Sequence, residues 1–406
     1  MENIPHLDDV SAGAVNHSED ALRRRSLPRR DGQGRRRGWA PTLVLALGLL
    51  GACSGIWHEP VDHAESSPSA RATFPPTTRS APREGRPEPF VAGSFDLDVI
   101  GEASGLALSV RNPGIAYVLD DGPGSTGVLA VDTTTGTTTR LTIEGLEGRD
   151  TEGLATGPCA GGGRQRAGGR GPGGEGERQR AAPTCLFIGD IGNNQSAWRS
   201  VQVWRIREPD LARRRSSASD DLPHMSEVVV TSDVATYTYP DAPVDAEALL
   251  VDEGRPFLIT KERREPGSGR TPRPRLLGAR RFADGRLRDF GALRLPAPRT
   301  GGWAAAFVGN VVTGADFDGE RVVARTYDHV LIYTPHVEGA PLRTLRRWKP
   351  REVATPPLRQ GEGVAMNRCG IWLISEGVDS IWLVPQHPRP VDDMQEVACP
   401  NGSAPS

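Results

Sequence analysis

Short runs of apolar residues, separated by turn residues, alternate along residues 91–399 of this chain. The runs have the length of strands and are rich in β-branched residues, as in Ile115–Leu119 and Ile371–Ile374. Apolar residues at the spacing of an amphipathic helix are almost absent. The pattern predicts an all-β domain.

The runs repeat in groups, each opened by a short motif that contains an acidic or small residue and usually a glycine. The motifs begin at Glu102, Asp150, Asp245, Val311 and Gln360, at intervals of 48, 95, 66 and 49 residues. Intervals near 50 residues, with three or four strands in each, are typical of β-propeller blades, which stack because one blade cannot bury both of its faces alone. We therefore predict a β-propeller of five or six blades, in preference to the alternative of a large β-sandwich.

Residues 1–52 have the features of an export signal. Three arginines, Arg35–Arg37, precede an apolar stretch, Trp39–Ala52, that is too short to span a bilayer. The stretch ends in Leu50–Cys53, a tetrapeptide that resembles the bacterial lipobox, in which the cysteine receives the lipid. We predict an extracytoplasmic protein tethered to the membrane through Cys53. The alternative is an ordinary cleavage site next to an unmodified cysteine.

Composition separates the rest of the chain into a domain and flexible segments. Residues 53–90 begin at the lipidated cysteine and are rich in Pro, Ser and Thr, which predicts a disordered stalk. Residues 160–182 are mostly Gly, Arg and Glu, which predicts a disordered insertion within a propeller that spans 91–399. Residues 400–406 are expected to form a tail.

Four cysteines remain if Cys53 carries the lipid, and an even number in an exported chain predicts disulfides. Three pairings are possible. We favour Cys159–Cys185 and Cys369–Cys399, because each of these bonds closes a local loop.

The charge of the chain argues against one class of partner. The formal net charge is -2, and the 49 basic residues include only two lysines, Lys261 and Lys349. Since no face rich in Lys or Arg is apparent, we expect no nucleic-acid partner. We expect a monomer whose contacts are the membrane, through the lipid anchor, and an envelope component or small molecule.

The candidate chemistry lies where the repeated motifs would line the central channel. The third residue of each motif is then equivalent in all five units, and these residues are Ser104, Glu152, Glu247, Thr313 and Glu362. Residues two positions apart in a strand share a face, so Asp150 should lie beside Glu152, and Asp245 beside Glu247.

Polar residues also end the strand that follows each motif, which predicts a second ring near the same mouth of the channel. Hard cations prefer several oxygen ligands, and a Lys and an Arg suit an anion beside the metal. The predicted Ca²⁺ ligands are Asp150, Glu152, Asp190, Asp245, Glu247 and Glu362, and the predicted anion-binding residues are Lys261 and Arg325. The structural alternative is that these carboxylates accept backbone N–H groups and that the glycines let adjacent blades approach.

Several segments resemble a group of secreted bacterial β-propellers that are similar to phytase-like and esterase-like phytase propellers. The segments are 152–155, 189–194, 203–209, 239–249 and 360–364. The resemblance covers most of 95–390 and implies the propeller fold and a Ca²⁺-dependent phosphate-ester hydrolase. Where the relatives have an aspartate, this chain has Asn193, which removes one possible metal ligand.

Other catalytic signatures are missing from the sequence. It contains no Gly-x-Ser-x-Gly, His-Glu-x-x-His or Walker motif. We therefore predict a binding or scaffolding module of the cell envelope, with a Ca²⁺-dependent phosphate-ester hydrolase as the alternative. A carbohydrate or peptide binder that uses Trp303 is a third hypothesis.

Overall fold

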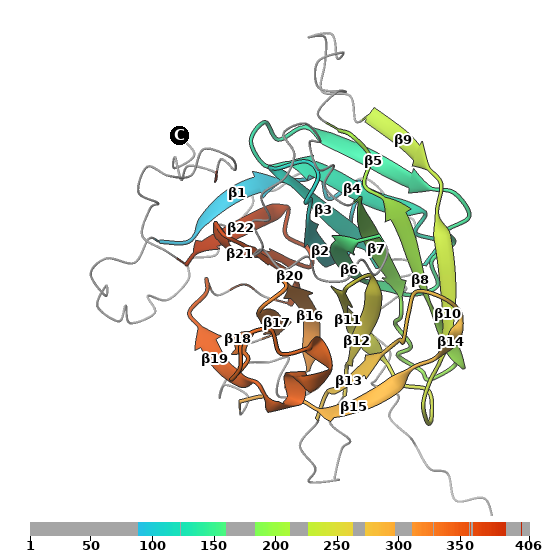
Figure 1. Ribbon diagram of the computed structural model, residues 1–406. Helices are drawn as coiled ribbons and strands as arrows, with labels where there is room; N and C mark the ends of the chain where they lie inside the picture. Colours follow the sequence, from blue (N-terminus) through green and yellow to red (C-terminus); the bar gives the residue numbers. More distant parts are fainter. Residues whose placement is uncertain are drawn as a thin grey trace, which may run out of the picture. The chain divides into compact units, whose positions relative to one another are not determined.

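The computed structural model of the chain describes residues 88–121, 123–159, 183–211, 226–262, 273–296, 311–327, 329–356, 358, 360–386 and 399 (Figure 1). The chain divides into two compact units, residues 1–77 and 78–406, and every described residue lies in the second unit. The predicted signal peptide, Cys53, nearly all of the stalk, the 160–182 insertion, Trp303 and the 400–406 tail lie outside the described residues.

The second unit is built from five sheets arranged around a common axis, which we call blades 1 to 5 in chain order (Figure 1). From the innermost to the outermost strand, blade 1 contains β2 (Ala103–Leu108), β3 (Ile115–Asp120), β4 (Gly127–Asp132), β5 (Thr138–Ile143) and β9 (Ser226–Val230). Blade 2 contains β6 (Thr151–Pro158), β7 (Thr184–Asp190), β8 (Ser200–Arg207), β10 (Asp233–Thr238) and β14 (Gly285–Arg286). Blade 3 contains β11 (Ala246–Asp252), β12 (Arg255–Thr260), β13 (Arg275–Gly278) and β15 (Arg288–Ala292).

The last two blades complete the ring. Blade 4 contains β16 (Val312–Phe317), β17 (Val322–Thr326), β18 (Val330–Thr334) and β19 (Lys349–Val353), with the short 3₁₀ helix η1 (Leu342–Arg347) before β19. Blade 5 contains β20 (Gly361–Asn367), β21 (Gly370–Ser375), β22 (Ser380–Pro385) and, at its outer edge, β1 (Phe90–Ser94). Each innermost strand contacts the innermost strands of both neighbouring blades. The predicted propeller is therefore confirmed, with five blades.

Strand pairing across long stretches of sequence closes the ring and links the blades. β1, the first strand of the domain, pairs antiparallel with β22, the last, so that both ends of the domain share blade 5. In the sequence β9 lies between β8 and β10 of blade 2, but it pairs parallel with β5 of blade 1. In the sequence β14 lies between β13 and β15 of blade 3, but it pairs parallel with β10 of blade 2. These exchanges cover two outer edges that would otherwise expose unpaired backbone groups.

The core consists of five layers of buried side chains, one between each pair of neighbouring blades. Successive residues of a strand point to opposite faces, so one strand supplies two layers. In β7, Leu186 and Ile188 pack toward blade 1, whereas Phe187 packs toward blade 3. Because both faces are covered, the strands are continuous apolar runs instead of alternating ones.

Both predicted disulfides are present. Cys159 is bonded to Cys185, with Cα atoms 4.9 Å apart, and Cys369 is bonded to Cys399, with Cα atoms 5.6 Å apart. The second bond ties a residue near the C-terminus to the β20–β21 turn of blade 5. Within the described part of the chain, no helix has the length and apolar character needed to cross a membrane.

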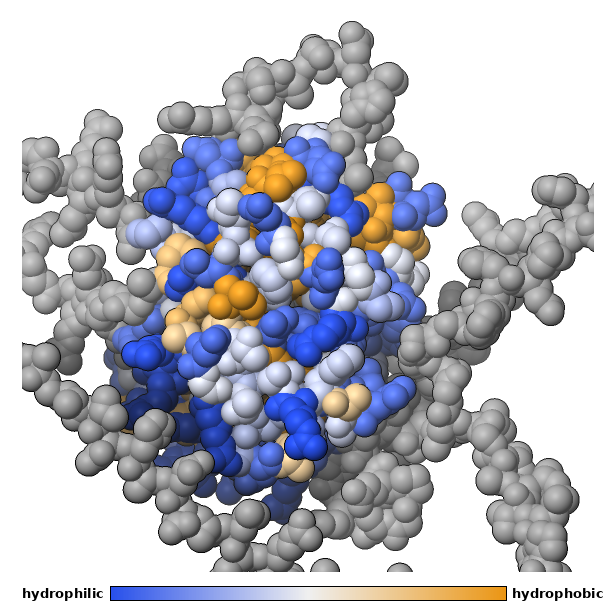
Figure 2. Space-filling view, turned by 90° about the vertical axis from the view of Figure 1, so that its right-hand side faces the viewer, coloured by the Kyte–Doolittle hydropathy of each residue, from blue (hydrophilic) through white to orange (hydrophobic). Residues whose placement is uncertain are grey.

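The side of the propeller that carries β9, β10 and β14 is largely hydrophilic, with a few separate hydrophobic patches (Figure 2). Val229 of β9 and Val234 of β10 are among the exposed apolar residues of the domain. Scattered residues of this kind are ordinary on protein surfaces.

Candidate functional site

Every innermost strand has a bulge at the same point of the repeat. The register with the second strand shifts at this point in all five blades. The bulged positions hold the five residues predicted to be equivalent, which are Ser104, Glu152, Glu247, Thr313 and Glu362, and all five are buried. A bulge inserts one residue and redirects its side chain. The sequence prediction of one ring around the axis is thus confirmed.

The glycines that follow the bulges let neighbouring blades approach. A Cβ atom on Gly153 of blade 2 would lie 2.7 Å from the Cβ atom of Leu249 of blade 3. One on Gly314 of blade 4 would lie 2.5 Å from the carbonyl oxygen of Glu362. Both distances are shorter than real Cβ contacts, so a side chain at either position would push the blades apart. The structural interpretation of these glycines is correct.

Lys261, at the end of β12, is the cation of the bulge ring. Its ammonium group forms an ion pair with Glu247, and both side chains are buried. Burial lowers the pKa of Lys261, but the carboxylates of Glu247, Glu152 and Glu362 outweigh it and hold the pKa well above its usual value. The ring of Tyr327 lies 5.8 Å from the Lys261 Nζ atom. The positive charge of one lysine therefore interacts with glutamates from blades 2, 3 and 5.

Two of these glutamates have strongly perturbed acidities. Burial, followed by the charge of Glu247, raises the pKa of Glu152 well above its usual value, although Lys261 opposes this shift. Burial and Glu247 raise the pKa of Glu362 in the same way, against Lys261 and Arg325. The cluster carries more carboxyl groups than cations, and this excess of negative charge adds to burial in raising the pKa values of both glutamates.

Arg325 is held by backbone groups of the neighbouring blade. Its guanidinium donates to the carbonyl oxygens of Gly363 and Ile374, and it donates to the Ser375 hydroxyl at 3.1 Å. Burial lowers its pKa to about 10. Gly361 leaves the space that the guanidinium fills, because a Cβ atom there would collide with it. The guanidinium thus links blades 4 and 5.

The rim of this mouth contains further carboxyl groups, including one that the sequence prediction missed. Asp121 has a pKa raised to about 8, first by burial and then by Glu102, Asp120 and Glu376. Asp120 accepts a hydrogen bond from the Glu102 N–H at 3.1 Å. Asp121 directly follows β3, which ends in the polar residue Asp120, and Tyr327 follows Arg325 by two residues. Their position after those strands was the available signal.

The predicted ligands Asp190 and Asp245 support the backbone of blade 2. Asp190 accepts hydrogen bonds from the N–H groups of Arg149 and Asp150, both at 2.9 Å, and pairs with the Arg149 side chain at 2.7 Å. Asp245 accepts from the Asn193 N–H at 2.8 Å. The structural alternative considered for these carboxylates therefore describes both of them.

Asn193 has a role that an aspartate could not fill. Its side-chain Nδ2 donates to the Trp198 carbonyl at 3.0 Å and to the Tyr239 hydroxyl at 3.2 Å, while its Oδ1 accepts from the Trp198 N–H at 3.0 Å. Trp198 in turn lies beneath the Arg149 guanidinium, 5.0 Å from the ring centroid. The amide is needed because it both donates and accepts.

The residues do not fit the predicted Ca²⁺ site. Glu152, Glu247 and Glu362 gather around Lys261, whereas Asp190 and Asp245 are occupied by backbone N–H groups. Asp150 lies near Asp190 and Asp245, and their charges contribute to a pKa raised chiefly by burial. Among the residues that the structure describes, no three His, Cys, Asp or Glu side chains are placed to hold one metal ion.

A cavity of about 830 Å³ lies at the opposite end of the channel, where the innermost strands end. Its lining comes from all five blades, through the ends of β2, β6, β11, β16 and β20 and through the turns that follow β2, β11, β16 and β20. We call it the turn-end cavity. A separate space of only about 10 Å³ lies between the innermost strands, and its lining includes Glu152, Glu247 and Leu154. The sequence analysis missed the turn-end cavity, since the turns share no motif.

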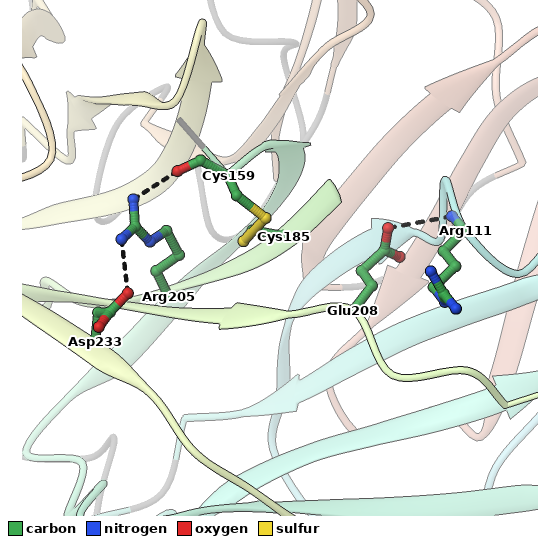
Figure 3. Close-up of a disulfide and its surroundings, with 6 residues drawn as sticks. All are labelled: Arg111, Cys159, Cys185, Arg205, Glu208 and Asp233. Atoms are coloured by element: carbon green, nitrogen blue, oxygen red, sulfur yellow. Dashed lines mark hydrogen bonds and ion pairs between the residues drawn. A yellow bond between two sulfur atoms is a disulfide. The ribbon is translucent and has the colours of Figure 1, made fainter. Parts of the chain in front are cut away.

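The walls of the turn-end cavity are fixed by polar contacts between blades. Glu208, a buried residue that follows β8, accepts a hydrogen bond from the Ser109 hydroxyl at 2.6 Å. It accepts another from the Arg111 N–H at 3.1 Å (Figure 3). It also accepts from the Val110 N–H at 3.2 Å. One carboxylate of blade 2 thereby holds the β2–β3 turn of blade 1, which lines the cavity.

Both disulfides lie next to cavity-lining residues. Cys159 follows Pro158 and Cys369 follows Arg368, and these preceding residues line the turn-end cavity. Arg205 donates to the Cys159 carbonyl at 2.5 Å and pairs with Asp233 at 2.6 Å (Figure 3). The end of β6 and the β20–β21 turn are thus each covalently braced beside the cavity.

Comparisons with known proteins identify no family for this chain. No protein-family model matches it, and no curated protein matches it. Among solved structures, it is similar to a chain of the nidogen/laminin complex, with 12% identity over 68% of this chain and 73% of that chain and a TM-score of 0.30. It is also similar to a putative oxidoreductase (glucose dehydrogenase) from Thermus thermophilus, with 10% identity over 73% and 99% of the two chains and a TM-score of 0.36. We draw no functional argument from such distant likenesses.

Proposed function

We propose that this chain is an extracytoplasmic binding module, anchored to the membrane through Cys53, that holds a small ligand in the turn-end cavity. The observation that carries the proposal is the cavity itself, of about 830 Å³, to which all five blades contribute. This volume lies within the range of small-molecule sites, which are mostly apolar with a few polar groups. The Glu208 contacts and the two disulfides give the cavity fixed walls, as a binding site requires.

The opposite end of the channel favours binding over phosphate-ester hydrolysis as the function of the chain. Hydrolysis would need Lys261 and Arg325 to hold a phosphate beside Ca²⁺. Lys261 is paired with Glu247, and Arg325 donates to backbone carbonyls and a hydroxyl. Removing these partners would leave buried charges unpaired, which costs several kcal/mol. The charges at this end support the ring, and we assign them no catalytic step.

The proposed location rests on two kinds of evidence. The two disulfides suggest an oxidising, extracytoplasmic compartment. The lipid anchor is proposed from the lipobox-like Leu50–Cys53 alone. Labelled palmitate should be incorporated into the wild-type chain and not into a Cys53→Ser variant, and the wild type should partition into detergent. Equal labelling of the two chains would contradict the anchor.

Thermal unfolding of the full chain in detergent tests the binding function. The compounds added are a panel of amino acids, short peptides, sugars, nucleotides and fatty acids. A ligand at about 100 times its dissociation constant stabilises the folded state by about 2.7 kcal/mol, which raises Tm measurably. Val110 is 58% exposed and lines the cavity, so Val110→Trp should block binding without unfolding the chain. Val229→Trp is the matched control, since Val229 is 68% exposed on β9 and does not line the cavity.

The two variants decide the outcome. A compound that raises the Tm of the wild type and of Val229→Trp, but not of Val110→Trp, supports binding in the turn-end cavity. If no compound of any class produces this pattern, the proposed function is wrong.

A further inference from the structure

The charged groups around the turn-end cavity are mostly paired with one another. Asp252 and Glu253 both pair with Arg255, at 3.2 and 2.9 Å. Asp318 pairs with Arg321, whose Nε and Nη2 atoms lie 3.1 and 2.9 Å from the Asp318 Oδ2 atom. Each of these three acids therefore already has an arginine partner at the rim.

Two charged lining residues stand apart from these pairs. Asp316 of β16 and Arg368 of the β20–β21 turn line the cavity, and neither forms an ion pair with another residue in the described ranges. They lie on neighbouring blades, because the Met366 N–H, two residues before Arg368, donates to the Asp316 Oδ2 atom at 2.8 Å. The cavity therefore presents one negative and one positive group on the same side.

The Asp316 carboxylate is held in place and keeps room for a further donor. Its Oδ1 atom accepts from the Phe317 N–H at 2.8 Å, and its Oδ2 atom from Met366. An ionised carboxylate has about four lone-pair sites, so each oxygen can accept another hydrogen bond. Burial raises the pKa of Asp316 to about 6, which a nearby cation would reverse.

The turn that carries Arg368 is also fixed. Asn367 accepts hydrogen bonds from the Cys369 N–H at 2.9 Å and from the Trp372 Nε1 atom at 3.0 Å. Cys369 is bonded to Cys399. The exposed guanidinium of Arg368 therefore extends from a rigid base, and a guanidinium matches the geometry of a carboxylate with two parallel hydrogen bonds.

The rest of the lining is largely apolar. It includes Leu108, Val110, Val251, Phe317, Met366 and Trp372, contributed by four of the five blades. Such walls favour a ligand with an apolar body. A cavity of about 830 Å³ has room for more than a single amino acid.

We propose that the turn-end cavity binds a short apolar peptide with free ends, whose ammonium group contacts Asp316 and whose carboxylate contacts Arg368. The inference rests on the proposed binding function and names the ligand class of that site. The ammonium group, the carboxylate and the apolar body of the peptide match the three features of the lining, which are Asp316, Arg368 and the apolar walls. Blocking either end of the peptide removes one charge-assisted hydrogen-bond partner and leaves the protein group uncompensated.

Isothermal titration calorimetry with the full chain tests this with the tripeptide Leu-Ala-Leu in three forms: free, N-acetylated and C-amidated. We expect each block to weaken binding by at least tenfold. Asp316→Asn should weaken binding of the free peptide, and acetylation should then cause no further loss of affinity. In Arg368→Gln, amidation should cause no further loss of affinity. The matched control is the double variant Asp318→Asn/Arg321→Gln, which alters a self-paired part of the lining and should leave both penalties unchanged.

The outcomes separate this inference from the proposed function. If the three peptides bind equally, or if the penalties persist in both single variants, the assignment of Asp316 and Arg368 is wrong. If a compound of another class binds in a manner sensitive to Val110→Trp while no peptide does, the ligand class is wrong but the binding module stands. If nothing binds in that manner, both proposals fail.

Discussion

Replacement of Lys261 by Met should destabilise the propeller strongly, and more so at high pH. Lys261 and Glu247 form a buried pair, with side chains 9% and 2% exposed. Removing one partner of such a pair costs about 3–5 kcal/mol, because the other charge is left buried. Met has a similar length and fills the space, so the loss is electrostatic and not a matter of packing.

The pH dependence follows from the glutamates that share Lys261. Glu152 and Glu362 have pKa values raised above the usual 4.5, so the stability they gain from protonation is present below about pH 4.5 and is lost as pH rises. Without Lys261 their pKa values rise further. The variant should therefore lose less stability at low pH, where protonation of these carboxyl groups is more favourable: about 1–2 kcal/mol at pH 5 and about 3–5 kcal/mol at pH 8.

Equilibrium unfolding in urea at pH 5 and pH 8, with the disulfides intact, measures these differences. Lys349→Met is the matched control, since Lys349 is exposed on β19 and should cost less than about 0.5 kcal/mol at either pH. Lys261→Met/Glu247→Gln should recover part of the loss, because it removes the orphaned charge. The reasoning is refuted if Lys261→Met behaves like Lys349→Met, or if its loss is larger at pH 5.

Three further variants test the packing of the blades and the walls of the cavity. Gly153→Ala should lower the free energy of unfolding in urea by about 1–3 kcal/mol, because the added Cβ atom meets the next innermost strand. Gly101→Ala is the control, since a Cβ atom there has open space around it, and it should change the stability little. Equal effects of the two variants would contradict the close approach of the blades. Glu208→Gln should cost about 1–3 kcal/mol and lower Tm, since the amide cannot accept all of the hydrogen bonds that the carboxylate does; an unchanged Tm would show that these bonds are dispensable. Cys159→Ser/Cys185→Ser should cost about 3.5 kcal/mol in urea unfolding, the loop-closure value for a separation of 26 residues, and a loss below about 1 kcal/mol would contradict a constraint on the unfolded chain.

Local features were predictable from the sequence because they recur in every blade or depend on neighbouring residues. The bulged ring that contains Glu152 and Glu247 follows from one motif repeated at blade spacing. The strands appear as continuous apolar runs because each is covered on both faces. The pairing of Cys159 with Cys185 followed from the short loop between them.

The partners of the charged residues depend on contacts between blades, which no local pattern reports. Lys261 pairs with Glu247 of its own blade 3, and Tyr327 of blade 4, Glu152 of blade 2 and Glu362 of blade 5 add to the electrostatic environment of this lysine. Asp190 was predicted to bind a metal from its position in the sequence, and in the fold its carboxylate accepts hydrogen bonds from the backbone N–H groups of Arg149 and Asp150. The residue types indicated where charged side chains lie along each blade. The direction of nearby backbone N–H groups decided which hydrogen bonds those side chains form.

The sequence by itself determined the all-β class, the repeated blade and the channel ring, and it favoured the disulfide pairing that is present, because these depend on periodicity and on neighbours along the chain. Only the tertiary structure decided that five blades close the ring, with β1 beside β22, since that pairing joins residues nearly 300 positions apart. The turn-end cavity is of the same kind. It forms where residues from all five blades meet, so Asp316 and Arg368 line one cavity only when blades 4 and 5 pack together.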